Sequence, residues 1–339
     1  MNKDCESNRT TPAPPPSKPC GGACCTPGSG RGAEKILTQP QHASPADAGI
    51  RAEGMAALPG GTFLMGTDYP GGFPEDGEGP VREVCVSPFA IDRCPVTNVE
   101  FARFVEATGY RTEAERYGWS FVFWLQVPAD QVKELAEDSA AAAPWWYKVP
   151  RAFWREPEGP GSSIDDRADH PVVHVSWNDA AAYASWAGKS LPTEAEWEFA
   201  ARGGLVQKLY PWGDELTPGG RHLCNIWQGE FPYRNTAEDG YEATCPVDAF
   251  PPNGYGLWST TGNVWEWCAD WFGNSFSAAG GAQNPTGPFS GQARVMKGGS
   301  FLCHASYCNR YRVAARTANT PDSSTSNIGF RCVQRVDRD

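Results

Sequence analysis

The chain has 339 residues, a hydrophobic content of 40% and a formal net charge of −11, which is enough apolar material for one substantial core. The negative charge is spread along the whole chain, so the composition excludes a phosphate-rich partner such as a nucleic acid. With 37 glycines, 30 prolines and 14 tryptophans, it also excludes a long helical bundle and predicts a compact, turn-rich fold.

The first 51 residues are rich in proline, serine, glycine and alanine and contain almost no large apolar side chains. Such a segment cannot bury enough surface to offset the entropy of ordering, so we predict a disordered tail over 1–51 and a single domain over 52–336. Cys20, Cys24 and Cys25 cluster in this tail. Three thiols could gather a soft metal, but without a fourth ligand the pattern favours incidental cysteines.

Two strands are predicted at the start of the domain, over 62–66 and 82–86, because apolar and β-branched residues are frequent there. Between them lies an acidic, glycine-rich loop with the run Glu75, Asp76, Gly77, Glu78. An acidic loop of this kind can bind a cation, but such runs usually face water. We therefore predict a solvated charged turn.

A first helix is predicted from its capping residues. Thr97 and Glu100 have the spacing of a capping box, in which each side chain bonds a free backbone N–H of the other residue. Phe101, Phe104 and Val105 then fall on one face at helical spacing. The pattern indicates an amphipathic helix that packs on the core.

Two further helices follow the same logic. Ser176 opens one of them, and Gly188 can end it in the left-handed conformation. Thr193 and Glu196 open the other, with Gly203 as its stop. We expect these helices to form scaffold rather than to carry chemistry.

From Tyr210 to Val333 the sequence shows short strand and turn patterns with many tryptophans and no helical periodicity. Near its end, Cys303 and Cys308 lie five residues apart among several arginines. Nearby cations favour the thiolate, the form that attacks or binds metal. A buried structural cysteine or a disulfide partner is the ordinary alternative, but the polar setting favours a reactive pair.

The run over 297–333 resembles the C-terminal signature of the formylglycine-generating enzymes, also called sulfatase-modifying factors. The resemblance extends over about 54–335, through the runs 60–66, 144–146, 170–172, 174–179, 191–198 and 262–267. The runs over 191–198 and 262–267 mark the wider superfamily and imply its fold, a single compact α+β domain of the C-type-lectin-like kind with little regular secondary structure. The thiol pair, with Ser300, Arg316 and Asn327, resembles the cysteine-oxidising branch.

The resemblance implies an oxidase that converts the cysteine of a Cys-x-Pro-x-Arg motif in a sulfatase to formylglycine, with O2 as co-substrate and release of sulfide. Cys303 and Cys308 would bind one Cu(I), because soft thiolates select this ion and two of them leave it open to the substrate cysteine. Loss of hydrogen from the substrate Cβ would give a thioaldehyde that water converts to the aldehyde. The sulfatase would thereby gain its own catalytic group.

Further roles are implied by the same resemblance. Ser300 is expected near the reacting sulfur as a third catalytic residue, and Arg316, Asn327 and Trp265 are expected along the bound peptide. His304 lies beside Cys303, but adjacent residues on a strand point to opposite faces, so we leave it out of the mechanism.

Two structural calcium sites are also implied. In the first, the side chains of Asn225 and Asp239 join the backbone carbonyls of Ile226 and Tyr241, a mixture of oxygens that calcium accepts. An ordinary Asn/Asp turn network is the alternative.

The second calcium site would use the carbonyls of Gly262 and Val264, the carboxylate of Glu266 and Ser259. Relatives commonly have asparagine where Ser259 stands, so one ligand is shorter in this chain. Both calcium ions would fix turns that hydrophobic packing alone holds poorly.

The cellular location is predicted from the lack of a signal-peptide or membrane-span pattern and from the lack of paired cysteines. The start lacks a basic region followed by an apolar one, and no stretch of about 18 apolar residues occurs. Where secreted relatives have partner cysteines, this chain has Ala184 and Ala201, so Cys332 has no evident mate. We expect a cytoplasmic, bacterial-type protein without membrane attachment, and a monomer, because no heptad or long apolar strip is visible.

Two other functions fit the superfamily. An iron oxygenase of the sulfoxide synthase type needs histidine and carboxylate ligands. The chain has only five histidines, His42, His170, His174, His222 and His304, and no separate N-terminal helical domain carries an HxxxH-like cluster. A lectin-like binding module without catalysis is the second alternative, and the retained thiol pair and Ser300 argue against it.

Overall fold

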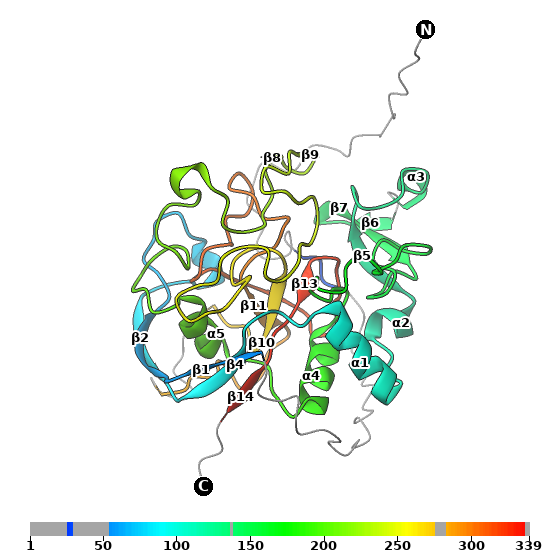
Figure 1. Cartoon of the computed structure of the whole chain (residues 1–339). Helices are drawn as coiled ribbons and strands as arrows, with labels where there is room; N and C mark the ends of the chain where they lie inside the picture. The colour runs from blue at the N-terminus through cyan, green and yellow to red at the C-terminus, as the bar shows by residue number, and fades with distance from the viewer. Residues whose placement is uncertain (1–25, 30–53, 136–137, 275–282, 336–339) are drawn as a thin grey trace.

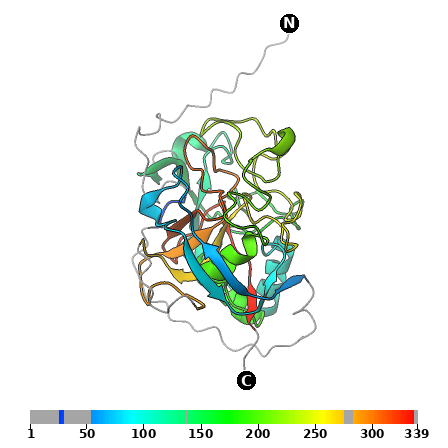
Figure 2. The same ribbon diagram turned by 90° about the vertical axis from the view of Figure 1, so that its left-hand side faces the viewer.

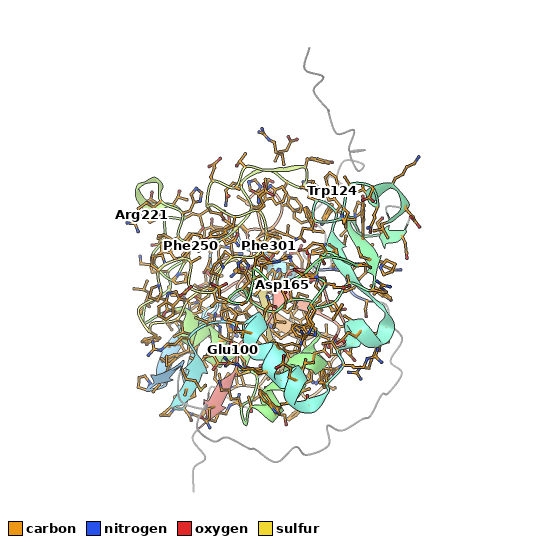
Figure 3. The ribbon with its side chains drawn as sticks, turned by 45° about the vertical axis from the view of Figure 1, so that its right-hand side comes forward. Glu100, Trp124, Asp165, Arg221, Phe250 and Phe301 are labelled. Carbon is orange, nitrogen blue, oxygen red and sulfur yellow. The ribbon has the colours of Figure 1, made fainter. Side chains whose placement is uncertain are left out.

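Residues 26–29, 54–135, 138–274 and 283–335 are described by the structure, a computed structural model. Within them, short helices and short strands are joined by long loops, as Figure 1 shows. The expected α+β domain with little regular secondary structure is therefore confirmed. Figure 3 shows how side chains fill the space between these elements. Phe301 is buried there, whereas Arg221 is exposed at the surface.

The beginning and the end of the domain meet in one sheet. Its strand order is β1-β4-β14, with β1 at Met55–Leu58, β4 at Phe89–Asp92 and β14 at Val333–Arg335, and both pairings are antiparallel. In Figure 2 the blue early strands lie beside the red last one. The last strand of the domain thus completes a sheet that the first strands begin.

The two strands predicted near the start are present. β2 at Gly61–Met65 and β3 at Arg82–Val86 pair antiparallel, Gly61 opposite Val86 and Met65 opposite Arg82. The loop between them contains one turn of 3-10 helix, η1, at Pro74–Asp76. This hairpin therefore presents the acidic loop to the rest of the domain.

The three predicted helices are also confirmed. They are α1 at Asn98–Thr108, α4 at Trp177–Trp186 and α5 at Glu194–Ala201. Each begins with a complete capping box, at Thr97, Ser176 and Thr193 respectively. Phe101 and Phe104 of α1 are buried against α4, and Figure 1 shows these two helices side by side.

The segment between α1 and α4 contains more structure than we predicted. It holds two short helices, α2 at Glu113–Tyr117 and α3 at Val132–Leu135. It also holds a sheet of order β5-β7-β6, with β5 at Trp119–Phe123, β6 at Ser139–Ala140 and β7 at Ala143–Pro150. The sheet buries a second aromatic cluster, to which Trp145, Trp146 and Phe231 belong.

A four-stranded sheet runs through the centre of the domain in the order β12-β11-β10-β13. These strands are β10 at Trp265–Trp271, β11 at Arg294–Lys297, β12 at Arg316–Asn319 and β13 at Ile328–Gly329. The remaining regular elements are the hairpin of β8 at Gly229–Glu230 with β9 at Arg234–Asn235, and the 3-10 turn η3 at Pro218–Gly220. Past Tyr210 no α-helix is found in the described ranges, as predicted.

One short piece of the predicted tail packs onto the domain. Thr26 is 1% exposed and Ser29 is 9% exposed, and both contact residues that follow β12 or end it. The prediction of disorder is therefore wrong for 26–29. The rest of the predicted tail, with Cys20, Cys24 and Cys25, lies outside the described residues.

Candidate active site

The structure brings the two thiols of the C-terminal signature together. Cys303 Sγ lies 3.6 Å from Cys308 Sγ, much longer than the ~2.05 Å of a disulfide bond. Metal–thiolate bonds of ~2.3 Å, as found at zinc, would allow both sulfurs to bind one ion. The two side chains are only 2% and 1% exposed, so the thiols are buried, although an arginine lies close to them as the sequence suggested. The thiols lie in the core, beneath a polar layer.

Local turns place the pair. Gly298 and Gly299 leave β11 with positive φ angles of 90° and 74°. A Cβ on Gly299 would lie 2.9 Å from Tyr311 Cα, so only glycine fits there. His304 O then accepts hydrogen bonds from the N–H groups of Tyr307 and Cys308, at 3.0 and 2.7 Å. This turn folds Cys308 back onto Cys303.

Ser300 and Asn327 lie next to the pair. The N–H of Ser300 points to Cys303 Sγ at 3.4 Å, and Asn327 Nδ2 donates to Ser300 Oγ at 2.9 Å. Thr325 Oγ1 donates to Asn327 Oδ1 at 2.6 Å, which fixes the orientation of the amide. Ser300 and Asn327 are 1% and 0% exposed. Two of the predicted site residues thus form a fixed polar contact beside the first thiol.

The acidic loop is part of this site, and the prediction that it is a solvated turn is wrong for two of its residues. Asp76 accepts from Arg310 Nε at 2.5 Å, and Arg310 Nη1 lies 3.8 Å from Cys308 Sγ. Glu78 accepts two hydrogen bonds from Arg312, at 2.6 and 2.7 Å. Burial raises the pKa of Asp76, and the contact with Arg310 opposes this rise. The loop therefore clamps the thiol loop through buried ion pairs.

Arg316 is placed in the same charged layer. Its guanidinium pairs with Glu194 at 2.7 and 2.8 Å, and it donates to the carbonyl of Asp76 at 3.1 Å. A second buried cation, Lys297, pairs with Glu198 at 3.0 Å. The described contacts of Arg316 thus join β12 to α5 and to the acidic loop.

A small pocket opens on the thiols, and half of its lining residues are aromatic. Trp145, Trp146, Phe231 and Tyr307 line it together with Ser300, Leu302, Cys303 and Cys308. Tyr307 stacks on Phe231 with ring centroids 4.8 Å apart and meets Trp145 edge to face at 5.0 Å. The sequence contained a signal for these residues, since 144–146 belongs to the resemblance and Tyr307 lies between the thiols.

Trp265 does not line this pocket. It is fully buried in β10 and belongs to the same core cluster as the thiols. The prediction that it walls the pocket is therefore wrong, and Trp145 and Trp146 take that place.

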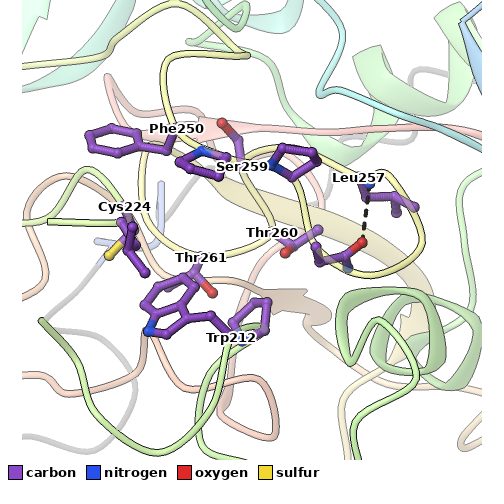
Figure 4. Close-up of a pocket in the computed structure, with 12 residues that line it drawn as sticks. Trp212, Cys224, Phe250, Leu257, Ser259, Thr260 and Thr261 are labelled. Atoms are coloured by element: carbon purple, nitrogen blue, oxygen red, sulfur yellow. Dashed lines mark hydrogen bonds between the residues drawn. The ribbon is translucent and has the colours of Figure 1, made fainter. Parts of the chain in front are cut away.

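A second pocket lies elsewhere, among the residues of Figure 4. Trp212, Phe250 and Leu257 line it, together with Ser259 and the single thiol of Cys224. The dashed line in the figure is the hydrogen bond from Leu257 N to Asn253 Oδ1, 3.1 Å long. Burial raises the pKa of Cys224, which disfavours its thiolate. This pocket therefore offers less chemistry than the thiol pair does.

The residues of the first predicted calcium site converge, and they fit a cation. Asn225 Oδ1 is buried and has no hydrogen-bond partner among the described residues. The carboxylate of Asp239 accepts only neutral N–H groups, from Ile226, Gln228 and Tyr241. Gln228 Nε2 donates to both Ile226 O and Asp239 Oδ2. Two of the predicted ligand oxygens therefore point toward the same position. Burial raises the pKa of Asp239, and these hydrogen bonds oppose the rise.

The residues of the second predicted calcium site do not fit. Both carboxylate oxygens of Glu266 pair with Arg331, at 2.6 and 2.7 Å, and Trp197 Nε1 donates a third hydrogen bond at 2.8 Å. Ser259 Oγ donates to Val247 O at 2.7 Å. Gly262 is required for another reason, because a Cβ there would lie on Asn225 O.

In this second site the predicted carboxylate, Glu266, thus meets a guanidinium of the chain itself. Gly262 and Val264 come shortly before Glu266, which lies in β10. The negative charge of Glu266, which would attract calcium, is already compensated by Arg331. Burial lowers the pKa of Arg331, but the paired carboxylate of Glu266 outweighs this effect, so the pKa is raised. We therefore correct the role of Glu266 from metal ligand to ion-pair partner.

The described histidines are engaged in other contacts. His174 is fully buried, and its two ring nitrogens lie 2.8 Å from Ser120 Oγ and 2.8 Å from Pro157 O. Burial lowers the pKa of His174 to about 3. His304 contacts Ser306 at 2.7 Å, and His170 contacts Thr244 at 3.0 Å. His42 lies outside the described residues.

Across the described ranges, no group of three or more His, Cys, Asp or Glu side chains could hold a metal ion. Cys332 forms no disulfide with any other described cysteine, as we expected. No helix in the same ranges is long and apolar enough to cross a membrane. The thiol pair is thus a two-sulfur site without a carboxylate or imidazole ligand.

The chain was compared with known families and proteins. A family model described as "Sulfatase-modifying factor enzyme 1-like domain" matches residues 40–336. A formylglycine-generating enzyme of Thermomonospora curvata is 66% identical over 285 residues, which are 83% of this chain and 93% of that protein. A protein of Bos taurus named inactive C-alpha-formylglycine-generating enzyme 2 is 51% identical over 84% of this chain and 89% of its own length.

A similar structure supports the fold. The structure of PvdO from Pseudomonas aeruginosa superposes with a TM-score of 0.60 at 26% identity, covering 83% of this chain and 94% of that one. Because similar proteins carry both an active and an inactive name, similarity over the whole chain does not by itself decide activity. The residues of the site have to decide it.

Proposed function

The chain belongs to the sulfatase-modifying factor enzyme 1-like family, and we propose that it is a copper-dependent oxidase that converts a sulfatase cysteine to Cα-formylglycine. The cysteine would lie in a Cys-x-Pro-x-Arg motif, and O2 would be the oxidant. The observation that carries the proposal is the pair of buried sulfurs, Cys303 Sγ and Cys308 Sγ, 3.6 Å apart. A chain that had kept the fold for display alone would not need two such thiols.

Cys303 and Cys308 would hold Cu(I), since soft thiolates select this ion over the harder divalent metals. When bound, it would supply the place where O2 is reduced. Arg310 stands 3.8 Å from Cys308 Sγ, and a nearby cation favours the thiolate that the site needs.

The remaining residues would position the target and keep the site dry. Ser300 Oγ, fixed by Asn327 at 2.9 Å, can hold a proton or a water beside the reacting sulfur. Trp145, Trp146, Phe231 and Tyr307 would exclude bulk water from the pocket. The acidic chain, with a net charge of −11, favours a basic target peptide.

The electrons of the overall reaction balance when a thiol reductant takes part beside the target cysteine and O2. The target Cβ loses its C–S bond and one C–H bond, gains a C=O bond and gives up two electrons. Reduction of O2 needs four electrons, so a thiol reductant supplies the other two. The products are the aldehyde, hydrogen sulfide, one water and the disulfide formed from two molecules of the reductant.

Calcium at Asn225, Ile226, Asp239 and Tyr241 is proposed as a structural ion, on the strength of the unpartnered Asn225 Oδ1. A monomeric enzyme is also proposed, because the sequence shows no heptad pattern or long apolar strip. The iron oxygenase alternative is disfavoured. The described histidines contact other groups, and no group of three or more His, Cys, Asp or Glu among the described residues could hold the iron that such an enzyme requires.

The test is direct. Copper-loaded protein, O2 and a thiol reductant are incubated with the peptide Leu-Cys-Thr-Pro-Ser-Arg, and mass spectrometry follows replacement of the thiol by the aldehyde. We expect conversion by the natural chain and by Cys85→Ser, whose thiol is far in sequence from the pair and half-buried, and none by Cys308→Ser. An unchanged peptide with the natural, copper-loaded chain would rule out the proposed activity.

A further inference from the structure

A short segment upstream of the domain is bound like a peptide ligand. Asn319 Nδ2 donates to Thr26 O at 3.3 Å and to Pro27 O at 3.1 Å, and Ser323 Oγ accepts from Ser29 N at 2.8 Å. Thr26 and Ser29 are 1% and 9% exposed. Side chains thus bind three backbone groups of a segment that lies more than 290 positions away in the sequence.

This mode of binding depends little on the side chains of the bound segment. Main-chain hydrogen bonds give affinity to any extended peptide, and pockets for side chains then select among them. At Gly28 a Cβ would lie 3.5 Å from Asn319 Oδ1, an ordinary contact, and Gly28 has no positive φ angle. A residue with a side chain therefore fits where Gly28 lies.

The place of this segment is linked to the proposed active site. Asn319 ends β12, whose first residue is Arg316, and Ser323 lies on the loop that leads to Asn327. Asn327 contacts Ser300 beside the thiols. Ser324 on the same loop is held by Ser120, with 2.8 Å between the two hydroxyl oxygens. A peptide bound at Asn319 and Ser323 thus lies along a loop that leads to Asn327, whose partner Ser300 lies next to Cys303.

The sequence of the segment matches the proposed target. Cys25, Thr26, Pro27, Gly28 and Ser29 have cysteine and proline at the spacing of Cys-x-Pro-x-Arg, with Ser29 in the place of the arginine. Thr26 and Pro27 are buried in the described part, and Cys25 is the preceding residue in the sequence, outside that part. The segment resembles a target that lacks the final guanidinium.

We propose that Asn319 and Ser323 form a binding site for the residues that follow the target cysteine, and that Thr26–Ser29 of the same chain occupies it until a target displaces it. This inference rests on the proposed function for the identity of the target. An occupant in the same chain competes at an effective concentration that can reach the millimolar range for short linkers. Competition raises KM and leaves kcat unchanged.

The test uses three full-length variants. Pro27→Glu places a charge in a buried position and releases the segment, so KM for Leu-Cys-Thr-Pro-Ser-Arg falls and kcat stays the same. Ser29→Arg completes the motif and strengthens the occupant, so KM rises. Pro14→Glu introduces the same charge elsewhere in the tail and leaves both constants unchanged. We expect at least about a tenfold span in KM between the first two variants, equal to ~1.4 kcal/mol.

A binding measurement separates this inference from the proposed activity. Fluorescence anisotropy with labelled Leu-Ser-Thr-Pro-Ser-Arg, which has no thiol to react, gives Kd for each variant. Conversion by the natural chain with equal KM and Kd in all variants would overturn the inference and leave the activity intact. Absence of conversion, with Kd lowered by Pro27→Glu and raised by Ser29→Arg, would support the binding site and overturn the activity.

Discussion

Buried side-chain oxygens have different partners in the loop that carries the thiols and in the loop over 225–241. Around the thiols, the carboxylates of Asp76, Glu78 and Glu194 each meet an arginine of the chain. In the other loop, Asn225 Oδ1 has no described partner, and the hydrogen bonds that Asp239 accepts from described residues come from neutral N–H groups. The first region supplies its own cations, whereas the second fits a cation from solution.

The largest effect is expected where an internal cation is removed. Arg312→Met leaves Glu78 buried without its guanidinium and should cost about 3–5 kcal/mol in the free energy of unfolding. Urea unfolding followed by tryptophan fluorescence measures this change. Lys208→Met, which breaks an exposed pair with Asp214, is the matched control and should cost less than about 1 kcal/mol. Equal losses of unfolding free energy in the two variants would contradict the interpretation that buried carboxylates near the thiols depend on arginines of the chain.

Calcium should act on the other loop alone. At a free calcium concentration of 100 times Kd, the unfolding free energy should rise by about 2.7 kcal/mol. Asp239→Asn should abolish this rise, and Ser259→Ala should keep it, because Glu266 at the second predicted site is already paired with Arg331. Thermal unfolding with calcium and with a chelator gives the comparison. A rise that depends on Ser259 instead would reverse our assignment of the two loops.

Lowering the pH should destabilise the protein, because His174 is buried in its neutral form near the thiol region. His174 contacts Ser120, which holds the loop before Asn327, and burial lowers the pKa of His174 to about 3. Below pH 6.5 the unfolded chain binds a proton that the folded chain refuses, so stability falls as the pH falls. The loss should be about 1 kcal/mol over the first pH unit below 6.5. His174→Gln should show a correspondingly shallower slope in unfolding measurements at pH 5.5–6.5.

The smallest effect is expected inside the acidic run itself. Glu75 is exposed, one residue from the buried Asp76. Glu75→Gln should change the unfolding free energy by no more than about 0.5 kcal/mol. Asp76→Asn, which weakens the contact with Arg310, should destabilise the protein clearly more and should lower the rate of peptide conversion. Similar values for the two variants in unfolding and activity assays would mean that the clamp does not matter.

Local signals in the sequence were sufficient for the scaffold. Thr97, Ser176 and Thr193 each cap a helix at the predicted residue, because a capping box is decided by side chains three positions apart. The strands predicted over 62–66 and 82–86 from their apolar and β-branched residues are present at 61–65 and 82–86. The same reasoning missed α2, whose capping box at Thr112 is equally local.

Charge pairing could not be predicted from sequence, because its partners are distant. Asp76 and Arg310 are separated by 234 positions, and Glu266 and Arg331 by 65. An acidic run is predicted to face solvent when the arginines that pair with it are far away in the sequence. For the same reason the resemblance indicated Glu266 as a calcium ligand, and the sequence gave no sign that Thr26, Pro27 and Ser29 are buried. The aromatic wall at Trp145 and Tyr307 likewise comes from segments far apart in the chain.

The sheet of β1, β4 and β14 has a consequence for synthesis of the protein. β4 at Phe89–Asp92 lies in its middle and receives its second neighbour from Val333–Arg335, and Asp92 also accepts from Cys332 N at 2.9 Å. During translation one edge of β4 therefore stays unpaired until almost the whole domain has left the ribosome. An open edge is a place where nascent chains join wrongly, so premature termination near the carboxyl end should yield aggregates rather than a slightly shorter enzyme.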